Sequence, residues 1–385
     1  MRSPPTFQTE SEIRVDLHAG PLGALAPIWQ ALIDPLHPGA PFRTFEWVSA
    51  WWSARSRAHQ AFVLVARRGG EVVGLLPLYA VSTPLAGRQL RFMGDGVVGS
   101  DYLGAIARRE HLPAVCAAFA RRLGELPVDK VELDGLLADD LLVAALTSSP
   151  RAESEQRYRC PYVRTRGDFD EYLSSLPEGV GQQFKRRLHT LQRVHGFDLE
   201  VLTSPDEIAR GMEVLFALHR RRWALAGGSD GIPGARAEAF HREAAHGLAH
   251  LGWARLFLLH VDGAPRAALY GWLYGGRFAF YQSGHEPAWR ARSVGTVLLG
   301  LVIRSCFADG LSEFDFLHGS EPYKLRWATA WRQTVRVRLR REGLRLRLYE
   351  TTRRLAHQLR APVRRMLPRR AHTVLRRLQR AREFW

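Results

Sequence analysis

Lysine is the scarcest charged residue in this sequence of 385 residues. The chain has 52 arginines but only three lysines, Lys130, Lys185 and Lys324. Where arginine has replaced nearly every lysine, a lysine retained in a loop suggests a need for its compact, titratable ammonium group. The stretch FLHGSEPYKLRW, residues 316–327, places Lys324 in such a loop after an apolar segment, beside Tyr323.

Cysteine is also rare, and long apolar runs are missing. The three cysteines lie far apart with no CxxC pair, which argues against a disulfide framework or a zinc site and predicts no metal. The longest apolar run, residues 294–303, is about half of what a bilayer crossing needs. The first twenty residues lack a signal-peptide core. We therefore expect a cytoplasmic protein.

The positive charge is concentrated at the end of the chain. Residues 332–385 contain 18 arginines against three glutamates, a balance of +15 out of the total of +17. Residues 335–348 alternate apolar and arginine positions, which predicts a strand with a turn at Glu342-Gly343, and the pattern after Pro368 is more helical. An arginine-rich amphipathic helix suits an anionic membrane surface or RNA, and a solvated extension is the plain alternative.

Two segments share one layout and predict a duplicated α/β unit. Residues 61–81 and 254–274 each contain two apolar stretches around a turn, Gly69-Gly70 in the first and Asp262-Gly263 in the second. A further apolar segment follows each. The polar, arginine-rich residues 148–166 between them predict a boundary. We therefore expect domains at residues 1–155 and 156–335, with an extension at 336–385.

Two helices are predicted in the second half. Phe184, Leu188 and Leu191 have helical spacing, with Gly196 as C-cap. A second helix begins near Ser204 or Asp206, and its apolar stripe includes His219. A histidine on an apolar face is usually a hydrogen-bonded core residue, and a chemical role for His219 is the alternative.

Residues 278–327 contain the pattern of an anion site. A strand, FAFYQSG, leads through a basic loop to a helix that begins near Gly295. The first turn of a helix has unpaired N–H groups and a partial positive charge, and Arg290 and Arg292 add to that field. A pyrophosphate fits this geometry.

The same loop resembles the coenzyme A pyrophosphate loop of GNAT acyltransferases. In the pattern Arg/Gln-x-x-Gly-x-Gly/Ala, Arg290 takes the first position and Gly295 the last, while Ser293 replaces the middle glycine. Six motifs in order resemble the CelD/BcsL-type branch of that superfamily, which is related to FemAB peptidyltransferases. They are FRTFEWVSAWW, RFMGDGVVGSDYLGAI, FKRRLHTLQRVHG, LHRRRW, YQSGHEPAW and FDFLHGSEPYKLRW.

The resemblance implies an α/β protein of two tandem GNAT-like mixed-sheet domains with flanking helices. It also implies transfer of an acyl or aminoacyl group to an amine, often in envelope or exopolysaccharide assembly. The donor would be acyl-CoA, such as acetyl-CoA, bound by Arg290, Arg292, Ser293 and Gly295. An aminoacyl-tRNA donor and a non-catalytic accessory protein of polysaccharide assembly are the alternatives.

Acyl transfer needs a deprotonated amine, a polarised carbonyl and a protonated leaving group. We expect Tyr323, with a pKa lowered by the neighbouring lysine, to protonate the leaving group, and a ring that packs under the loop is its alternative role. Asp315 is expected to orient Lys324 or accept the amine proton, with a plain ion pair to an arginine as the alternative. His219 is a further catalytic candidate, and His285 an alternative base. The residues expected to contact the substrate, a small-molecule or glycan-precursor amine, are Lys324, Tyr281, His285 and Asp101.

No serine–histidine–acid order, HExxH or P-loop pattern stands out, which argues against hydrolase and nucleotidase functions. The arginine-rich extension adds peripheral attachment to the inner face of a membrane, or RNA binding, as further possibilities for the protein's partners.

Overall fold

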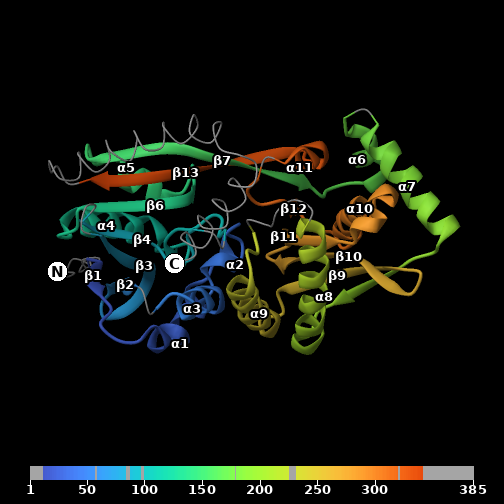
Figure 1. Cartoon of the computed structure of the whole chain (residues 1–385). Helices are drawn as coiled ribbons and strands as arrows, with labels where there is room; N and C mark the ends of the chain where they lie inside the picture. Colours follow the sequence, from blue (N-terminus) through green and yellow to red (C-terminus); the bar gives the residue numbers. More distant parts are fainter. Residues whose placement is uncertain are drawn as a thin grey trace, which may run out of the picture.

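A computed structural model describes residues 12–56, 59–83, 87–96, 99–177, 179–224, 231–319 and 321–340. The described part is an α/β structure in which strands from both halves of the chain join one mixed sheet flanked by helices (Figure 1). None of the described helices is both long and apolar enough to cross a membrane.

Apart from β7 and β13, which lie in the middle, the strands of the first half lie on one side of the sheet and those of the second half on the other (Figure 1). The sheet order is β1-β2-β3-β4-β6-β13-β7-β12-β11-β10-β9-β8, and β5 pairs with β3. The strand bounds are β1 (Arg14–Leu17), β2 (Gln60–Arg68), β3 (Glu71–Thr83), β4 (Gly87–Phe92), β5 (Ile106–Ala107), β6 (Lys130–Leu137), β7 (Ala152–Arg164), β8 (Asp198–Leu202), β9 (Ala254–Val261), β10 (Ala264–Tyr274), β11 (Arg277–His285), β12 (Glu313–Asp315) and β13 (Ala330–Arg340).

The duplicated layout expected from the sequence is confirmed. β2 and β3 form an antiparallel hairpin, as do β9 and β10. Asp262 and Gly263 both have positive φ, which a two-residue hairpin turn of this kind requires. In each half the third strand then pairs in parallel with a later one, β4 with β6 and β11 with β12.

The two halves meet through a pair of long strands, β7 and β13. β7 pairs with β12 of the second half and with β13, and β13 pairs in turn with β6 of the first half. The polar segment 148–166, expected as a boundary, is therefore largely a strand inside the sheet. The division at residues 155 and 156 stays a prediction, and it falls within β7.

Charge pairing explains why this polar segment forms a strand. Its acidic residues face arginines across the sheet: Glu155 lies 2.7 Å from the Arg338 guanidinium, and Glu153 lies 3.0 Å from that of Arg340. These are diagonal pairs, since Glu155 lies opposite Arg336 and Glu153 opposite Arg338, and opposite charges on neighbouring strands stabilise their pairing. The charges that suggested a linker are thus cross-strand partners. The extension beyond residue 340, including the expected turn and helix, lies outside the described residues.

Most helices of the first half are short, and several of those in the second half are longer. Their bounds are η1 (Leu22–Leu25), α1 (Ala26–Trp29), η2 (Gln30–Leu32), α2 (Ala40–Arg43), α3 (Phe45–Ser53), α4 (Leu112–Glu125), α5 (Leu141–Thr147), α6 (Phe169–Ser175), α7 (Val180–Val194), α8 (Pro205–Ala224), α9 (Ala235–His250), η3 (Pro287–Arg292), α10 (Val294–Ala308) and α11 (Pro322–Trp327).

The predicted ends of α7 and α8 are confirmed. Gly196, just past α7, has a φ of 70° and donates its N–H to Leu191 O. At the start of α8, Ser204 Oγ accepts from Glu207 N, and the Glu207 carboxylate accepts from Ser204 N. This reciprocal arrangement is a capping box, and it satisfies N–H groups that the first turn leaves unpaired.

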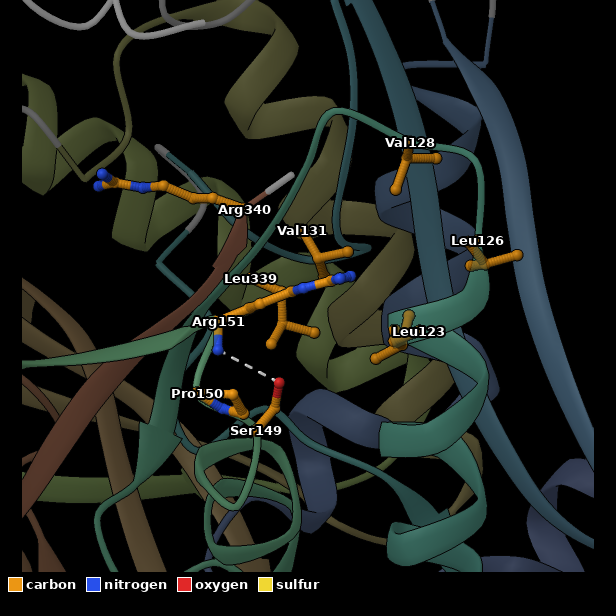
Figure 2. A pocket seen from close by; sticks show the side chains of 10 residues that line it. Leu123, Leu126, Val128, Val131, Ser149, Pro150, Arg151, Leu339 and Arg340 are labelled. Carbon is orange, nitrogen blue, oxygen red and sulfur yellow. Dashed lines mark hydrogen bonds between the residues drawn. The ribbon is translucent and has the colours of Figure 1, made fainter. Parts of the chain in front are cut away.

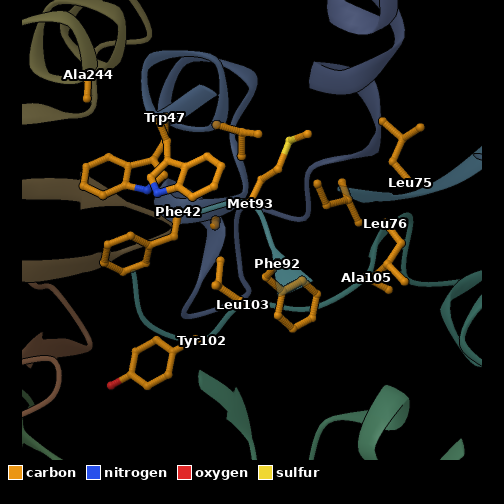
Figure 3. Packing of buried hydrophobic residues seen from close by; sticks show 14 of the residues in the cluster. Phe42, Trp47, Leu75, Leu76, Phe92, Met93, Tyr102, Leu103, Ala105 and Ala244 are labelled. Atoms are coloured by element: carbon orange, nitrogen blue, oxygen red, sulfur yellow. The ribbon is translucent and has the colours of Figure 1, made fainter. Parts of the chain in front are cut away.

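One hydrophobic core extends across both halves. It joins the first half to α8 and α9, while a second core lies on the opposite face, under α7 and α10. Figure 3 shows part of the shared core, with Phe42 and Trp47 from the first half and Ala244 from α9. Phe42 and Trp47 contact Trp272 of β10 edge to face, with ring centroids 5.1 and 5.3 Å apart.

Trp47→Ala tests whether this core links the halves. Trp47 is completely buried, so its truncation should lower the free energy of unfolding by about 3–5 kcal/mol. Because the core is shared, urea denaturation should show a single transition in the wild type and in Trp47→Ala. Fluorescence and circular dichroism should report the same midpoint for it. Trp331→Ala is the control, since Trp331 is 63% exposed. Separate transitions for the two halves would contradict the shared core.

Candidate functional site

A shallow hollow of about 230 Å³ lies in the first half, between the end of α4, β6 and the last residues of β13 (Figure 2). Its lining is mainly apolar and includes Leu126, Val131 and Leu339. None of the site residues expected from the sequence lines it, so the chemistry lies elsewhere.

A gap opens in the sheet of the second half, between β11 and β12. These parallel strands pair only from Arg277 opposite Glu313 to Ala279 opposite Asp315. β11 then continues to His285 without β12 beside it. Tyr281 is the extra residue of a β-bulge, because Gln282 pairs with Tyr270 and Phe280 with Gly271. Bulges often occur next to active sites, where they redirect a side chain.

At this gap, Asp101 of the first half meets His318 of the second. The Asp101 carboxylate lies 2.7 Å from His318 Nδ1 and also accepts the backbone N–H of His318 at 3.0 Å. Because a carboxylate only accepts, Nδ1 carries a proton and Nε2 is left as the basic nitrogen. Asp101 is 4% exposed, whereas the His318 side chain is 40% exposed.

The Asp101 carboxylate raises the pKa of His318 above its ordinary value, although burial acts in the opposite direction. The imidazole also lies over the ring of Tyr158, with centroids 5.4 Å apart. A half-exposed histidine that is oriented by a buried carboxylate has the arrangement of a general base. His318 was not among the residues singled out from the sequence.

Lys324 lies directly behind this pair. Its Nζ donates to the His318 carbonyl at 2.7 Å and lies 3.3 Å from the Glu321 carboxylate. The loop expected around Lys324 is in fact the short helix α11, which begins after Glu321 with Pro322 at its first position. Lys324 is 7% exposed, so the ammonium group supports the backbone of His318.

Asp315 is buried beneath the same loops, and its two oxygens are occupied. One accepts from Tyr102 OH at 3.1 Å and from Leu317 N at 2.7 Å, and the other accepts from Arg332 at 2.7 Å. The expectation that Asp315 orients Lys324 is therefore wrong, because Lys324 has other partners. Burial raises the pKa of Asp315, and the Arg332 guanidinium opposes that shift.

Both residues that donate to this one Asp315 oxygen have strained backbones. Tyr102, next to Asp101, has a φ of 56°, and Leu317, next to His318, has a φ of 59°. Non-glycine residues in this region cost about 1–3 kcal/mol each, and such strain persists only where surrounding contacts enforce it. Asp315 thus holds both loops in the conformation that brings the carboxylate and the imidazole together.

Arg43, in the motif FRTFEWVSAWW, fixes the first of these loops. Its guanidinium donates to Tyr102 O and Ala105 O, both at 2.9 Å, and pairs with Asp140 at 3.2 Å. In the same motif, Trp47 Nε1 donates to Ser100 Oγ at 2.8 Å. Two side chains of this motif therefore hold the loop around Asp101 in place by hydrogen bonds.

Tyr281 completes the wall of the site. A Cβ built on Gly99 would lie 3.2 Å from His318 Cε1 and 3.9 Å from the Tyr281 hydroxyl, so both groups border Gly99. Burial, followed by the charge of Asp101, raises the pKa of Tyr281 well above its usual range. Its phenol is therefore neutral at physiological pH.

Tyr323 lies on α11 beside Lys324, but the lysine does not lower its pKa. Burial, followed by the charge of Glu321, raises the pKa of Tyr323, and the opposing charge comes from Arg222 of α8. The expectation of an acidified phenol is therefore wrong. The hydroxyl keeps its proton at physiological pH, as a proton donor must.

The two histidines expected from the sequence lie at different depths. His219 is 2% exposed, and burial lowers its pKa to about 4. Its Nε2 is buried and has no hydrogen-bond partner among the described residues. His285 ends β11, and burial together with Arg222 and Arg290 lowers its pKa to about 4. Both imidazoles are therefore neutral at physiological pH.

The predicted strand, basic loop and helix are confirmed in β11, η3 and α10. Ser293 has a φ of 55° and caps α10, where its carbonyl accepts from Thr296 N and Val297 N. Gly295 lies against His285, since a Cβ there would be 3.4 Å from Nδ1. Arg290 is exposed, whereas Arg292 donates to His195 Nε2 at 3.0 Å and lies over Trp289.

The structure therefore brings Asp101, Tyr281 and Lys324 together around His318, and places His285 at the opposite end of the gap beside Gly295. It keeps Asp315 and His219 buried. His318 carries no local mark beyond its place next to Gly319, and its partner lies 217 positions away in the sequence.

Asp101→Asn should lower the pKa of His318. A raised folded pKa means that the protonated imidazole stabilises the fold below about pH 6.5, and that this stabilisation is lost as the pH rises through the folded pKa. NMR titration of the His318 Cε1–H resonance should give a value above 6.5 in the wild type and a lower value in the variant. Asp309→Asn, at an exposed position, is the control. An unchanged His318 pKa in Asp101→Asn would contradict the pairing.

Comparisons with known proteins agree with this fold. Residues 180–325 match a family model described as an acetyltransferase (GNAT) domain. No curated protein matches the sequence. The solved structure of FemX is similar with a TM-score of 0.59 at 11% identity, over 87% of this chain and 99% of its own.

Two further solved structures are similar at low identity. One is a conserved protein of unknown function from Bacteroides thetaiotaomicron, with a TM-score of 0.54 at 11% identity over 85% of this chain and 100% of its own. The other is the C-terminal domain of a putative lysylphosphatidylglycerol synthetase from Agrobacterium fabrum, with a TM-score of 0.51 at 10% identity over 80% of this chain and 95% of its own. The narrower likeness to the CelD/BcsL branch stays a prediction. Residues 180–325 thus match a GNAT acetyltransferase domain model, and the chain is similar in fold to FemX.

Proposed function

We propose that the protein is an N-acyltransferase that moves an acyl group from acyl-CoA to an amine, on an amino sugar or on another envelope or exopolysaccharide precursor. The observation that carries this proposal is the Asp101–His318 pair at the gap between β11 and β12. His318 lies inside the segment that matches the GNAT domain model. A GNAT-type fold with a positioned base at its open strand edge suits amine acylation.

In the proposed reaction, the acceptor reacts as its free amine, and His318 Nε2 removes one proton from that nitrogen as it attacks. The amine nitrogen then forms a bond to the thioester carbonyl carbon, and the C–S bond breaks. Asp101 stabilises the imidazolium that forms, because its carboxylate holds the Nδ1 proton. Tyr323 protonates the departing thiolate, since its phenol stays neutral at physiological pH, and the phenolate regains a proton from solvent while the His318 imidazolium releases one.

Lys324 and Asp315 act in this scheme as positioning residues. Lys324 holds the His318 carbonyl, and Asp315 holds Tyr102 and Leu317 on either side of the pair. Contact of Lys324 with the substrate, as first expected, stays a prediction, because its ammonium group has three N–H donors and the His318 carbonyl and Glu321 are two partners. Tyr281, with its hydroxyl beside Gly99, is placed to contact the acceptor.

For the donor, we propose the first turn of α10. The N–H groups of Val294 and Gly295 have no acceptor among the described residues, and Arg290 is exposed next to them. Such a turn suits the pyrophosphate of coenzyme A. Arg292 contributes less than expected from the sequence, because its side chain is engaged with His195 and Trp289.

An aminoacyl-tRNA donor is the second candidate. It is favoured by Ser293 in place of the middle glycine of the pyrophosphate loop, and by the arginine-rich residues 341–385. The same residues are our proposed contact with RNA or with an anionic membrane surface, in a protein that we expect in the cytoplasm or at the inner face of the membrane.

Calorimetry with acetyl-CoA and longer acyl-CoAs tests the donor, and transfer to a panel of amino sugars tests the reaction. Arg290→Ala should weaken acyl-CoA binding about tenfold, since it removes one charge-assisted contact. His318→Gln should lower kcat about 10²–10⁴-fold with little change in acyl-CoA affinity, as expected for loss of a general base. His189→Gln, at an exposed position of α7, is the control.

Saturable binding that Arg290→Ala weakens about tenfold would support a coenzyme A donor. If the wild type binds no acyl-CoA, the coenzyme A donor is wrong and transfer should be sought with aminoacyl-tRNA. If His318→Gln transfers at the wild-type rate, His318 is not the base.

A further inference from the structure

Three consecutive arginines end α8, and one of them differs from the other two. Arg220 pairs with Glu238 at 2.5 Å, and Arg221 pairs with Glu286 at 2.6 Å. Arg222 has no carboxylate within 4 Å among the described residues; its Nη1 reaches only the hydroxyl and carbonyl oxygens of Ser283, at 3.3 and 3.5 Å. Arg222 is half-buried, and its guanidinium lies over the Trp223 ring, 5.2 Å from the centroid, so it is partly desolvated without an acidic partner.

Arg222 lies at the gap between β11 and β12. Ser283 belongs to the part of β11 that has no β12 beside it. Burial lowers the pKa of Arg222, and the neighbouring Tyr323 and Glu321 act in the opposite direction. Burial and then the charge of Arg222 lower the pKa of His285. Arg222 therefore contacts the unpaired part of β11 through Ser283, and Tyr323, Glu321 and His285 lie within range of its charge.

The groups around Arg222 are rich in hydrogen-bond donors. Tyr323 keeps its phenolic proton, Ser283 carries a hydroxyl, and the Nε and Nη2 groups of Arg222 make no hydrogen bond among the described residues. Glu321 is the nearby acid, and its carboxylate is already shared with Lys324 at 3.3 Å. A partly desolvated guanidinium with free N–H groups matches two oxygens of a phosphate or carboxylate.

We infer that Arg222 binds an anionic oxygen group, a phosphate or a carboxylate, on the acceptor substrate. This inference rests on the proposed transferase function and defines its acceptor class as amines that also carry such a group. The anion belongs to the acceptor rather than the donor because Tyr323 and Glu321, the neighbours of Arg222, belong to the α11 segment next to His318. The donor's proposed anchor, the first turn of α10, has its own N–H groups and Arg290.

Binding of matched amino sugars tests the inference without relying on activity. The probes are glucosamine 6-phosphate, muramic acid as the carboxylate form, and neutral glucosamine, each titrated with and without saturating coenzyme A. The wild type should prefer at least one anionic probe over glucosamine by about tenfold or more. Arg222→Gln should abolish that preference, and Arg221→Gln, in which the neighbouring arginine is lost instead, should keep it.

The outcomes separate the two proposals. A preference for the phosphate or for the carboxylate probe that only Arg222→Gln removes supports the inference and identifies the group. Equal binding of all three probes, or a preference that Arg222→Gln retains, overturns it. If Arg222→Gln instead weakens coenzyme A about tenfold and leaves the probes unchanged, the anion belongs to the donor and the inference is wrong. If coenzyme A does not bind the wild type, the proposed coenzyme A donor is wrong, and the probe titrations without coenzyme A still decide the inference about Arg222.

Discussion

The site depends on one buried carboxylate, that of Asp315. A buried carboxylate is stable only with strong partners, and this one has Arg332 on one oxygen and the Tyr102 hydroxyl and Leu317 N–H on the other. Tyr102 and Leu317 come from opposite halves of the chain, and each lies next to a member of the Asp101–His318 pair. The carboxylate therefore fixes the distance between two loops that are far apart in sequence.

The rest of the architecture supports that junction. β7 and β13 carry the sheet from one half to the other, and Arg332 comes from β13. Arg43 holds the backbone of the loop around Asp101. Positive φ at two non-glycine residues is unfavourable by itself, so the surrounding hydrogen bonds must offset it. Because each half supplies only one member of the acid–base pair, neither half alone can form the site.

Features that depend on residues close together in the sequence could be predicted from it. The hairpins, the Gly196 cap, the Ser204 cap and the basic turn before α10 depend on residues a few positions apart, and all were confirmed. Strand β7 was mistaken for a boundary because its acidic residues Glu153 and Glu155 are paired with arginines of β13, a strand almost two hundred residues later. His318 was missed for the same reason, since Asp101 is 217 positions away. A histidine beside a glycine looks like any loop residue until its partner is known.

A double-mutant cycle between Asp101→Asn and His318→Gln, measured as free energy of unfolding at pH 6, tests the central claim most directly. At that pH the imidazole is largely protonated, because its pKa is raised above 6.5. If the two halves meet at this pair, the double variant should lose less than the two single losses combined, with a coupling free energy of about 1 kcal/mol or more. Additive losses would contradict the account, because they would mean that the two side chains do not interact in solution.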